Sequence, residues 1–449
     1  MKLKAFAAAL IMAVLLSGCS MVGLDAQTLM HPPKASGERE AIHTLLQKKA
    51  GENITLKYPH TGDYRSAIIM HDISGDKQDE AVAFYQSGDT GASIHIVFIN
   101  KVNGQWNLVG SFQNASTQVD KVCFGDVNGD GKDEAIVGWE NAISNTGELC
   151  VYTFDKNKVS ELRTKQSYSQ MAVMDFDDDG YQEIFTASTT STTNQDQAAV
   201  AKLMRIKSNK VQIQGMAHLD TSVTKYAAIS MGRINEKQYG VVLDGTKSST
   251  AMVTEIVYWD KANSVLQSPF YNKSTQSANY MLRNTTTVSQ DINNDKIIEI
   301  PVTHLLPGCQ SGTTDETSYS IDWQRYDTET MNLIPVMRTV MNSSSGYWFL
   351  LPDMWQGKVT VKADAKTNSI TFYEWKVTSK NKNGSAGAAL LKISVFTEKE
   401  WNSSNTANGY FKLSERNNTV YAANIPQPNN ALSMKMDDIQ NSFRLISQN

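Results

Sequence analysis

An acidic segment of nine residues occurs four times in this sequence, at 72–80, 126–134, 175–183 and 291–299. In the second copy Asp126, Asn128 and Asp130 stand at alternate positions, and Glu134 ends the segment directly before an apolar run. Hard cations such as Ca²⁺ take about six to eight oxygen ligands, which a short loop with alternating carboxylates can supply. The repeat therefore predicts several calcium-binding loops, each leading into a strand.

Each copy offers side-chain oxygens at its first, third, fifth and ninth positions. Ser74 in the first copy is neutral and therefore a weaker ligand than a carboxylate. The candidate ligands are Asp72, Ser74, Asp76 and Glu80; Asp126, Asn128, Asp130 and Glu134; Asp175, Asp177, Asp179 and Glu183; and Asp291, Asn293, Asp295 and Glu299.

The spacing of the copies predicts the architecture. They begin at 72, 126, 175 and 291, so the intervals are 54, 49 and 116 residues. The last interval is about twice the others, and a degenerate copy without acidic ligands lies near its middle, at 232–243. Repeats of about 40–55 residues with strand-like content are typical of β-propellers, whose blades are four-stranded antiparallel sheets. We therefore expect an all-β fold.

The number of blades follows from the length of the repeat region. At about 54 residues per blade, residues 54–430 form about seven blades, with six as the alternative. The strand expected at 54–58 would complete the last blade. Short helices are expected at 38–50 and 436–445, so the propeller domain would span 38–449.

The acidic segments differ from EF-hand loops. An EF-hand closes with a Glu at position 12, but that position holds Ala83, Val137, Thr186 and Val302 here. The closing carboxylate stands at position 9 instead, and a strand follows it directly.

With this spacing, the segments resemble the FG-GAP or VCBS repeats of integrin-α-like β-propellers. The resemblance implies Ca²⁺ bound by side chains at positions 1, 3, 5 and 9 and by the carbonyl of position 7. That carbonyl would come from Lys132 in the second loop and from Tyr181 in the third. The family usually has Asp at position 9, so Glu here makes that ligand less secure, and Asp79 or Asp133 at position 8 could replace it.

The four loops are not equivalent. Gly131 and Gly180 occupy position 6 in the second and third loops, where a tight loop needs positive φ. Lys77 and Lys296 occupy it in the first and fourth, which would place an ammonium group beside the cation. We expect two to four structural Ca²⁺ sites, favouring the second and third loops. The first and fourth could be acidic turns only.

The N-terminus has the features of a targeting segment. Lys2 and Lys4 precede an apolar run at 5–16, which is too short to span a bilayer. The run ends in Leu-Ser-Gly-Cys at 16–19, which resembles the bacterial lipobox. An ordinary secretory signal is the alternative.

The lipobox resemblance implies a signal peptide at 1–18, a lipid on Cys19 and a tether at 19–37. The protein would then be anchored to the membrane on its extracytoplasmic face. Cys123 and Cys150 could form a disulfide there, although buried free thiols are equally compatible with the sequence, and Cys309 has no obvious partner.

The sequence restricts the possible functions without identifying a partner. The net charge of −4 argues against a basic nucleic-acid-binding protein. Metalloprotease, nucleophile-elbow and phosphate-loop motifs are absent from the sequence. We expect a module that binds a protein or a glycan and is not an enzyme. A polysaccharide lyase or hydrolase is the alternative. Tyr347, Trp348 and Trp355 cluster near a loop-rich stretch, where exposed aromatic rings could stack on sugars or anchor a protein partner, but we favour core packing for them.

Overall fold

The computed structural model describes residues 37–88, 93–141, 146–155, 157–190, 199–403 and 409–446. The expected signal peptide and Cys19 lie outside these ranges, as does the tether except for Gly37. No helix in the described ranges is long and apolar enough to cross a membrane.

The described residues form six antiparallel sheets of four or five strands each, numbered here in chain order. Sheet 1 contains β1 (Ile54–Leu56), β2 (Ile68–His71), β3 (Glu80–Ser87), β4 (Ile94–Val102) and β5 (Gln105–Asn114). Sheet 2 contains β6 (Gln118–Gly125), β7 (Glu134–Asn141), β8 (Thr146–Asp155) and β9 (Lys158–Tyr168). Sheet 3 contains β10 (Gln170–Met174), β11 (Glu183–Ser188), β12 (Val200–Lys207) and β13 (Lys210–His218).

The second half of the chain continues this pattern. Sheet 4 contains β14 (Lys225–Arg233), β15 (Tyr239–Ser248), β16 (Ala251–Asp260) and β17 (Val265–Gln267). Sheet 5 contains β18 (Ile300–Leu305), β19 (Tyr319–Asp327), β20 (Asn332–Asn342), β21 (Tyr347–Leu350) and β27 (Phe443–Leu445). Sheet 6 contains β22 (Val359–Asp364), β23 (Ser369–Lys376), β24 (Ser385–Thr397), β25 (Phe411–Arg416) and β26 (Thr419–Asn424).

This fold is mostly β and consistent with six propeller blades, so the alternative count holds and seven is wrong for the described residues. The repeat length changes along the chain: the main antiparallel units of sheets 1 to 4 begin at 68, 118, 170 and 225, but those of sheets 5 and 6 begin at 300 and 359. The expected closure by the N-terminal strand is also wrong. β1 pairs with β3 in its own sheet, with Ile54 opposite Ser87.

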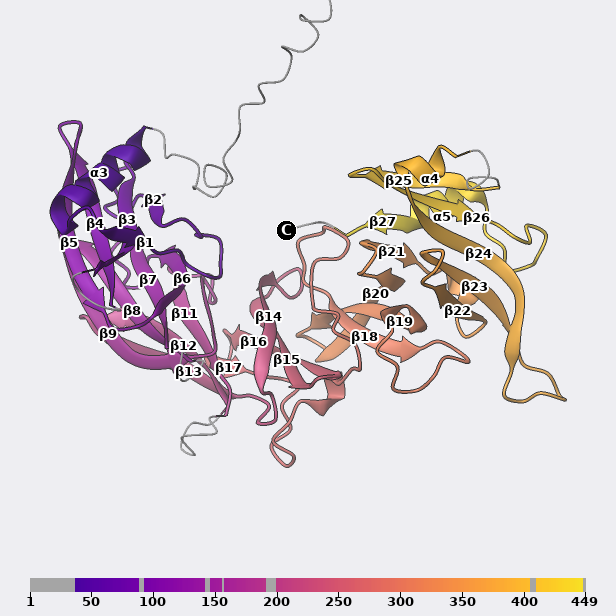
Figure 1. Ribbon diagram of the computed structural model, residues 1–449. Coiled ribbons are helices and arrows are strands. Elements are labelled where there is room, and N and C mark those ends of the chain that lie inside the picture. The colour runs from indigo at the N-terminus through magenta and orange to yellow at the C-terminus, as the bar shows by residue number, and fades with distance from the viewer. Residues whose placement is uncertain are drawn as a thin grey trace, which may run out of the picture.

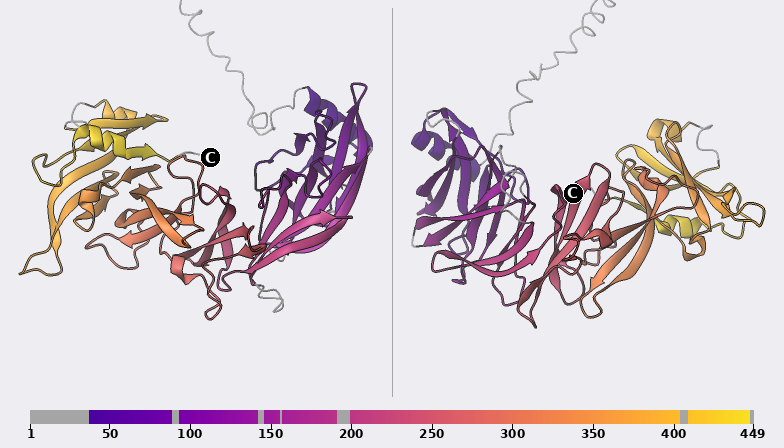
Figure 2. Two further views of the ribbon diagram at one scale, coloured as in Figure 1. Left: turned by 180° about the vertical axis from the view of Figure 1, so that it is seen from behind. Right: turned by 90° about the horizontal axis from the view of Figure 1, so that it is seen from below.

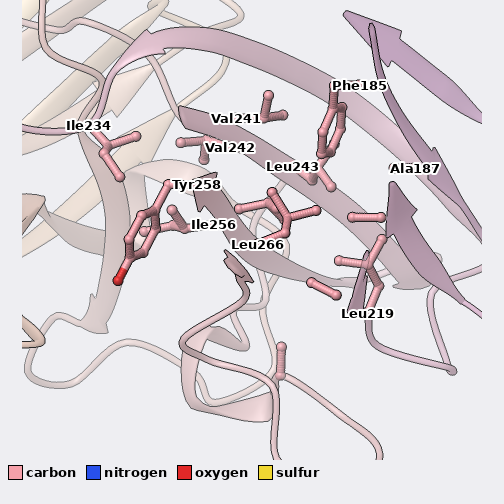
Figure 3. Packing of buried hydrophobic residues seen from close by; sticks show 14 of the residues in the cluster. Phe185, Ala187, Leu219, Ile234, Val241, Val242, Leu243, Ile256, Tyr258 and Leu266 are labelled. Atoms are coloured by element: carbon pink, nitrogen blue, oxygen red, sulfur yellow. The ribbon is translucent and has the colours of Figure 1, made fainter. Parts of the chain in front are cut away.

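The sheets follow one another along an arc, and sheets 1 and 6 lie at its opposite ends in every view (Figures 1 and 2). Buried hydrophobic clusters join sheets 1 and 2, sheets 2 and 3, sheets 3 to 5, and sheets 5 and 6. Figure 3 shows part of the cluster of sheets 3 to 5, where Phe185 of β11 lies near Leu243 of β15. β11, which follows the third acidic loop, is buried along its whole length because neighbouring sheets cover both of its faces.

Few helices accompany the sheets. α3 (Glu38–Ala50) has the expected bounds and packs Ile42 and Leu46 against sheet 1. α5 (Met436–Ser442) is shorter than expected, because the chain turns at its end into β27, which pairs with β21. Further short helical segments within the described ranges are α4 (Glu398–Trp401), η2 (Asn279–Met281), η3 (Glu316–Ser318) and η4 (Asp353–Trp355), among others.

Cys123, Cys150 and Cys309 are free thiols in the structure, so no disulfide joins the first two. Burial raises the pKa of Cys123 to about 11 and that of Cys150 to about 12. Both cysteines therefore act as small apolar residues within the sheets.

Candidate metal centre

The acidic loops occupy equivalent hairpins in four of the sheets. The first three join β2 to β3, β6 to β7 and β10 to β11, and the fourth leads into β18 behind a bridge between Gln290 and Glu299. The degenerate copy is the matching turn of sheet 4, between β14 and β15. There Asn235 replaces the acidic set and accepts hydrogen bonds from the backbone N–H groups of Lys237 and Gln238.

The first acidic residue of each loop organises the backbone. In the second loop, Asp126 accepts hydrogen bonds from the N–H groups of Gly129 at 2.7 Å and Gly131 at 2.8 Å. The equivalent Asp72, Asp175 and Asp291 accept from the N–H of the residue at position 6, which is Lys77, Gly180 and Lys296 respectively. These contacts explain why every copy begins with Asp.

Position 6 has positive φ in all four loops, whether it is glycine or lysine. The values are 69° at Lys77, 84° at Gly131, 93° at Gly180 and 69° at Lys296. Lysine therefore adopts the left-handed region at some cost in strain. Both lysines are exposed, and neither forms an ion pair with an acidic residue of its loop in the described structure. The ammonium group expected beside the cation is not found there.

The closing glutamates are buried, with exposed fractions of 0–1%. Each accepts a hydrogen bond from the N–H of position 2, as Glu183 does from Phe176 at 2.8 Å. Burial, supported by the charges of Asp130 and Asp126, raises the pKa of Glu134 to about 8. Burial likewise raises the pKa of Glu183 and Glu299 to about 7, and raises that of Glu80. A nearby cation would lower these pKa values again.

The fourth loop fits a metal ion best. Asp291, Asp295 and Glu299 offer carboxylate oxygens that all lie within 4.8 Å of one another. One oxygen of the buried Glu299, Oε1, has no hydrogen-bond partner, while Oε2 accepts from the N–H of Ile292 at 3.1 Å. Asn293, the predicted ligand at position 3, instead bonds with its side-chain Oδ1 to the N–H of Asp295.

The first loop shares one of these features. Oε1 of the buried Glu80 also lacks a hydrogen-bond partner. Asp76 accepts from the N–H of Gln78, and Ser74 donates its own backbone N–H to Glu80 Oε2. Among the described residues, no group of three His, Cys, Asp or Glu side chains close enough to hold a metal lies in this loop.

The third loop contains an internal cation that the sequence analysis missed. Asp175, Asp177 and Asp179 offer oxygens close enough to hold a metal. However, Arg205 Nη2 lies 3.3 Å from Asp177 Oδ1 and 2.8 Å from Asp179 Oδ2, and it also contacts Glu183 Oε1. The only available signal was register: Ile184 of β11 pairs with Met204 of β12, which places the next residue beside Glu183.

In the second loop, both carboxylate oxygens of the closing glutamate have hydrogen-bond donors, and neither donor is a cation. The side-chain Nδ2 of Asn128 donates to Glu134 Oε1. Asp133, the suggested substitute ligand, is turned away and bonds to His71 Nε2 at 2.8 Å. The backbone N–H groups of Lys132 and Tyr181 donate to Asp130 and Asp179, and the role of their carbonyl groups stays a prediction.

The aromatic cluster separates in the structure. Tyr347 and Trp355 are each only 1% exposed and belong to the core of sheets 5 and 6. Trp348 points to the other side of β21, where it is half-buried near Ile292 of the fourth acidic loop.

No protein-family model matches the chain, and no curated protein matches it. Among solved structures, a similar chain is a protein from Lactobacillus plantarum, with 6% identity, a TM-score of 0.31, and 74% of this chain and 86% of that chain covered. Another is the exotype rhamnogalacturonan lyase YesX, with 9% identity, a TM-score of 0.29, and 83% and 91% covered. Neither similarity assigns a family or a function.

Proposed function

We propose that this chain is a membrane-anchored binding module whose sheets are stabilised by Ca²⁺ in the acidic loops, with the fourth loop as the main site. The observation that carries the proposal is Glu299 Oε1, which is buried beside Asp291 and Asp295 without a hydrogen-bond partner. Burying a carboxylate that has one oxygen without a hydrogen-bond partner and no compensating cation is costly. A cation held by the three carboxylates removes that cost.

The donor set favours calcium over other metals. Asp291, Asp295 and Glu299 contribute only carboxylate oxygens, which suit hard cations. Calcium tolerates irregular sets of about six to eight oxygens, whereas Mg²⁺ demands near-octahedral geometry. At an extracellular-type Kd of about 10⁻⁴ M and about 1 mM Ca²⁺, one occupied site would add about 1.4 kcal/mol to the free energy of unfolding.

The membrane location rests on the sequence. Cys19 follows a basic and apolar signal-like segment and would carry the lipid. A folded domain held on this anchor would meet proteins or glycans outside the cytoplasm. Substituting Cys19→Ser is expected to move the protein from the membrane fraction to the soluble fraction in its native host. Unchanged membrane retention of this variant would contradict lipid anchoring.

The metal proposal is tested on the mature protein in mild detergent, with bound metal counted and thermal unfolding followed in Ca²⁺ and in chelator. Calcium is expected to bind and to raise the unfolding temperature. Glu299→Gln keeps an acceptor for the N–H of Ile292 but should lose one ion and most of the calcium effect. In chelator this variant should be at least as stable as the wild type, because it no longer buries an unpaired charge.

The matched control for this experiment is Glu329→Gln, a glutamate that is 72% exposed on its side chain and pairs with Lys237. It should retain the metal count and the calcium response of the wild type. Wild-type protein that binds no calcium would overturn the proposal. If the protein released unsaturated or reducing ends from polysaccharides, it would be a polysaccharide lyase or hydrolase and the binding-module proposal would be wrong.

A further inference from the structure

A cavity of about 560 Å³ lies directly beside the fourth acidic loop. Asp291, Asn293 and Asn294 form one wall, and Trp348, Asn441 and Arg444 are among the residues of the others. Its volume is in the range of about 300–1,000 Å³ that is typical of small-ligand sites. The predicted calcium loop therefore faces a space that can hold a ligand.

Another wall of the cavity is formed by two paired strands, β21 and β27. Trp348 of β21 and Arg444 of β27 are direct cross-strand partners, so their side chains leave the sheet on the same face. The C-terminal segment is held in place by a hydrogen bond from the N–H of Ile446 to the carbonyl of Gly346 at 2.9 Å. Arg416 also donates to the carbonyl of Ile446 at 2.6 Å. The aromatic and cationic groups thus sit on an anchored part of the chain.

The two side chains offer complementary chemistry. Trp348 is half-buried and packs against the buried cluster that contains Ile292, which restricts the motion of its ring. Arg444 is exposed, and its Nη1 donates to the carbonyl of Phe443 at 2.7 Å. Guanidinium groups recognise carboxylates with charge-assisted hydrogen bonds, and an aromatic face binds the apolar face of a ring.

The calcium loop needs further oxygens. Asp291, Asp295 and Glu299 supply three carboxylates, whereas Ca²⁺ takes about six to eight oxygens. The side chain of Asn293 is already hydrogen-bonded within the loop: its Oδ1 accepts from the N–H of Asp295, and its Nδ2 donates to the carboxylate of Asp295. A ligand in the cavity that carries a carboxylate and neighbouring hydroxyl groups can supply the missing oxygens.

We propose that this cavity binds an acidic saccharide, with a uronic acid unit placed between the calcium loop, Trp348 and Arg444. The proposal rests on the calcium site proposed above. A carboxylate on the ligand can coordinate the metal and pair with the guanidinium group of Arg444, and a sugar ring can stack on Trp348. The amide side chains of Asn293, Asn294 and Asn441 on the cavity walls suit sugar hydroxyl groups. A neutral sugar lacks the first of these interactions.

The test is calorimetric titration of the mature full chain with a trimer of galacturonic acid, in Ca²⁺ and in chelator, with a galactose trimer as the neutral probe. The galacturonic acid trimer is expected to bind the calcium-loaded protein. Its affinity should fall by at least about 10-fold in chelator, and the galactose trimer should bind the calcium-loaded protein at least about 10-fold more weakly. Arg444→Gln and Trp348→Ala should each weaken binding by about 10-fold or more.

Two controls separate binding from folding. Arg65→Gln and Trp106→Ala alter the same residue types in the N-terminal part of the chain and should leave affinity within about twofold of the wild type. Trp348→Phe keeps an aromatic ring in case Trp348→Ala fails to fold, and it should retain partial affinity. Each variant is checked for an unchanged calcium count and unfolding temperature.

The outcomes distinguish this inference from the calcium proposal. Protein that binds calcium but not the acidic trimer would overturn the saccharide site and leave the calcium module intact. Protein that binds no calcium would overturn the calcium proposal and with it this inference. Equal binding of the neutral and acidic trimers, or equal binding in chelator, would also overturn the proposed recognition of a carboxylate by calcium and Arg444.

Discussion

The guanidinium group of Arg205 lies against the buried carboxylate of Glu183, with Nε donating to Oε1 at 2.5 Å. The same group bridges Asp177 and Asp179, so it neutralises the third acidic loop from a neighbouring strand. In the fourth loop the equivalent glutamate oxygen, Glu299 Oε1, has no hydrogen-bond partner. The same sequence repeat thus compensates its buried carboxylates in two ways: in the third loop by the guanidinium group of Arg205, and in the fourth loop, as we propose, by a bound metal ion.

The first prediction concerns this internal cation. Arg205→Gln removes the positive charge from beside three carboxylates, so in chelator it should lower the free energy of unfolding by about 3–5 kcal/mol. Calcium should restore part of this loss, because the freed carboxylates of Asp177, Asp179 and Glu183 can then accept an ion. Counting bound metal should show one more calcium in the variant than in the wild type.

Arg163→Gln is the control for Arg205→Gln. Arg163 bonds to Glu161 on sheet 2, and its side chain is 59% exposed. Its loss should cost less than about 1 kcal/mol, with no change in the number of bound ions. An Arg205→Gln variant with unchanged metal content and unchanged calcium response would show that the third loop does not exchange its guanidinium for a metal.

Local pattern predicted much of this fold. The helix at 38–50 and the hairpins around the acidic loops were readable because apolar periodicity and turn chemistry are encoded within a few residues. The number of blades could not be predicted from local pattern, because irregular segments such as 268–299 lengthen the C-terminal repeats. The same limit applies to partners distant in sequence: Arg205 joins the third loop, and Arg444 meets Trp348, only through strand register.

The second prediction concerns a buried ion pair between Asp244 of β15 in sheet 4 and Arg283 in the segment after η2. Arg283 Nη2 bonds to Asp244 Oδ1 at 2.7 Å, and both side chains are about 1% exposed. Arg283 also donates to Thr254 Oγ1 at 2.6 Å and to the carbonyl of Thr287 at 2.8 Å. Arg283→Met should cost about 3–5 kcal/mol in the free energy of unfolding, because Asp244 is left as an uncompensated buried charge.

A double-mutant cycle isolates this charge effect. Asp244→Asn alone should be destabilising, but in the Arg283→Met background it should cost much less, because no unpaired charge remains. Chemical denaturation of the four proteins measures the coupling, expected at about 1–3 kcal/mol. Additive losses would mean that packing, and not the ion pair, determines the effect. The exposed Arg233→Met serves as the surface control.

The third prediction concerns the space that Gly138 leaves for a tyrosine. A Cβ added to Gly138 would stand 1.7 Å from the hydroxyl of Tyr168, whose ring is 1% exposed. That hydroxyl donates to Asp120 at 2.6 Å, so the ring cannot move without losing the bond. Gly138→Ala should therefore lower stability by about 1–3 kcal/mol through overpacking.

The partner variant Tyr168→Ala tests the cause. In that background Gly138→Ala should cost little, because the conflicting ring is gone. Gly88→Ala, whose added Cβ would have its nearest neighbour at an ordinary 3.9 Å, is the matched control and should change stability by less than about 0.5 kcal/mol. Denaturation midpoints that fall equally in both backgrounds would exclude the steric explanation.

The last prediction concerns acid stability in sheet 5, where His304 of β18, Asp322 of β19 and Arg338 of β20 meet. Arg338 Nη2 bonds to Asp322 Oδ2 at 2.9 Å, and His304 Nε2 lies 3.4 Å from the same oxygen. Burial alone would raise the pKa of Asp322, but hydrogen bonds from His304 and Arg338 and their charges lower it from 3.8 to about 2. The ionised carboxylate is thus favoured in the folded state, so this stabilisation is complete above about pH 4 and is lost as the pH falls towards 2.

The shift of Asp322 corresponds to about 2 kcal/mol. Asp322→Asn should remove it, so the variant should lose less stability than the wild type between about pH 4 and 2. His304 shows the opposite dependence: its hydrogen bond to Asp322 raises its pKa, so its contribution is present below about pH 6.5 and is lost as the pH rises through the raised value. Unfolding free energies measured across this range should therefore be flatter at both ends in Asp322→Asn. Asp63→Asn, at an exposed position between β1 and β2, is the control and should leave the pH profile of the wild type unchanged. A profile of Asp322→Asn that runs parallel to that of the wild type would refute the role of Asp322.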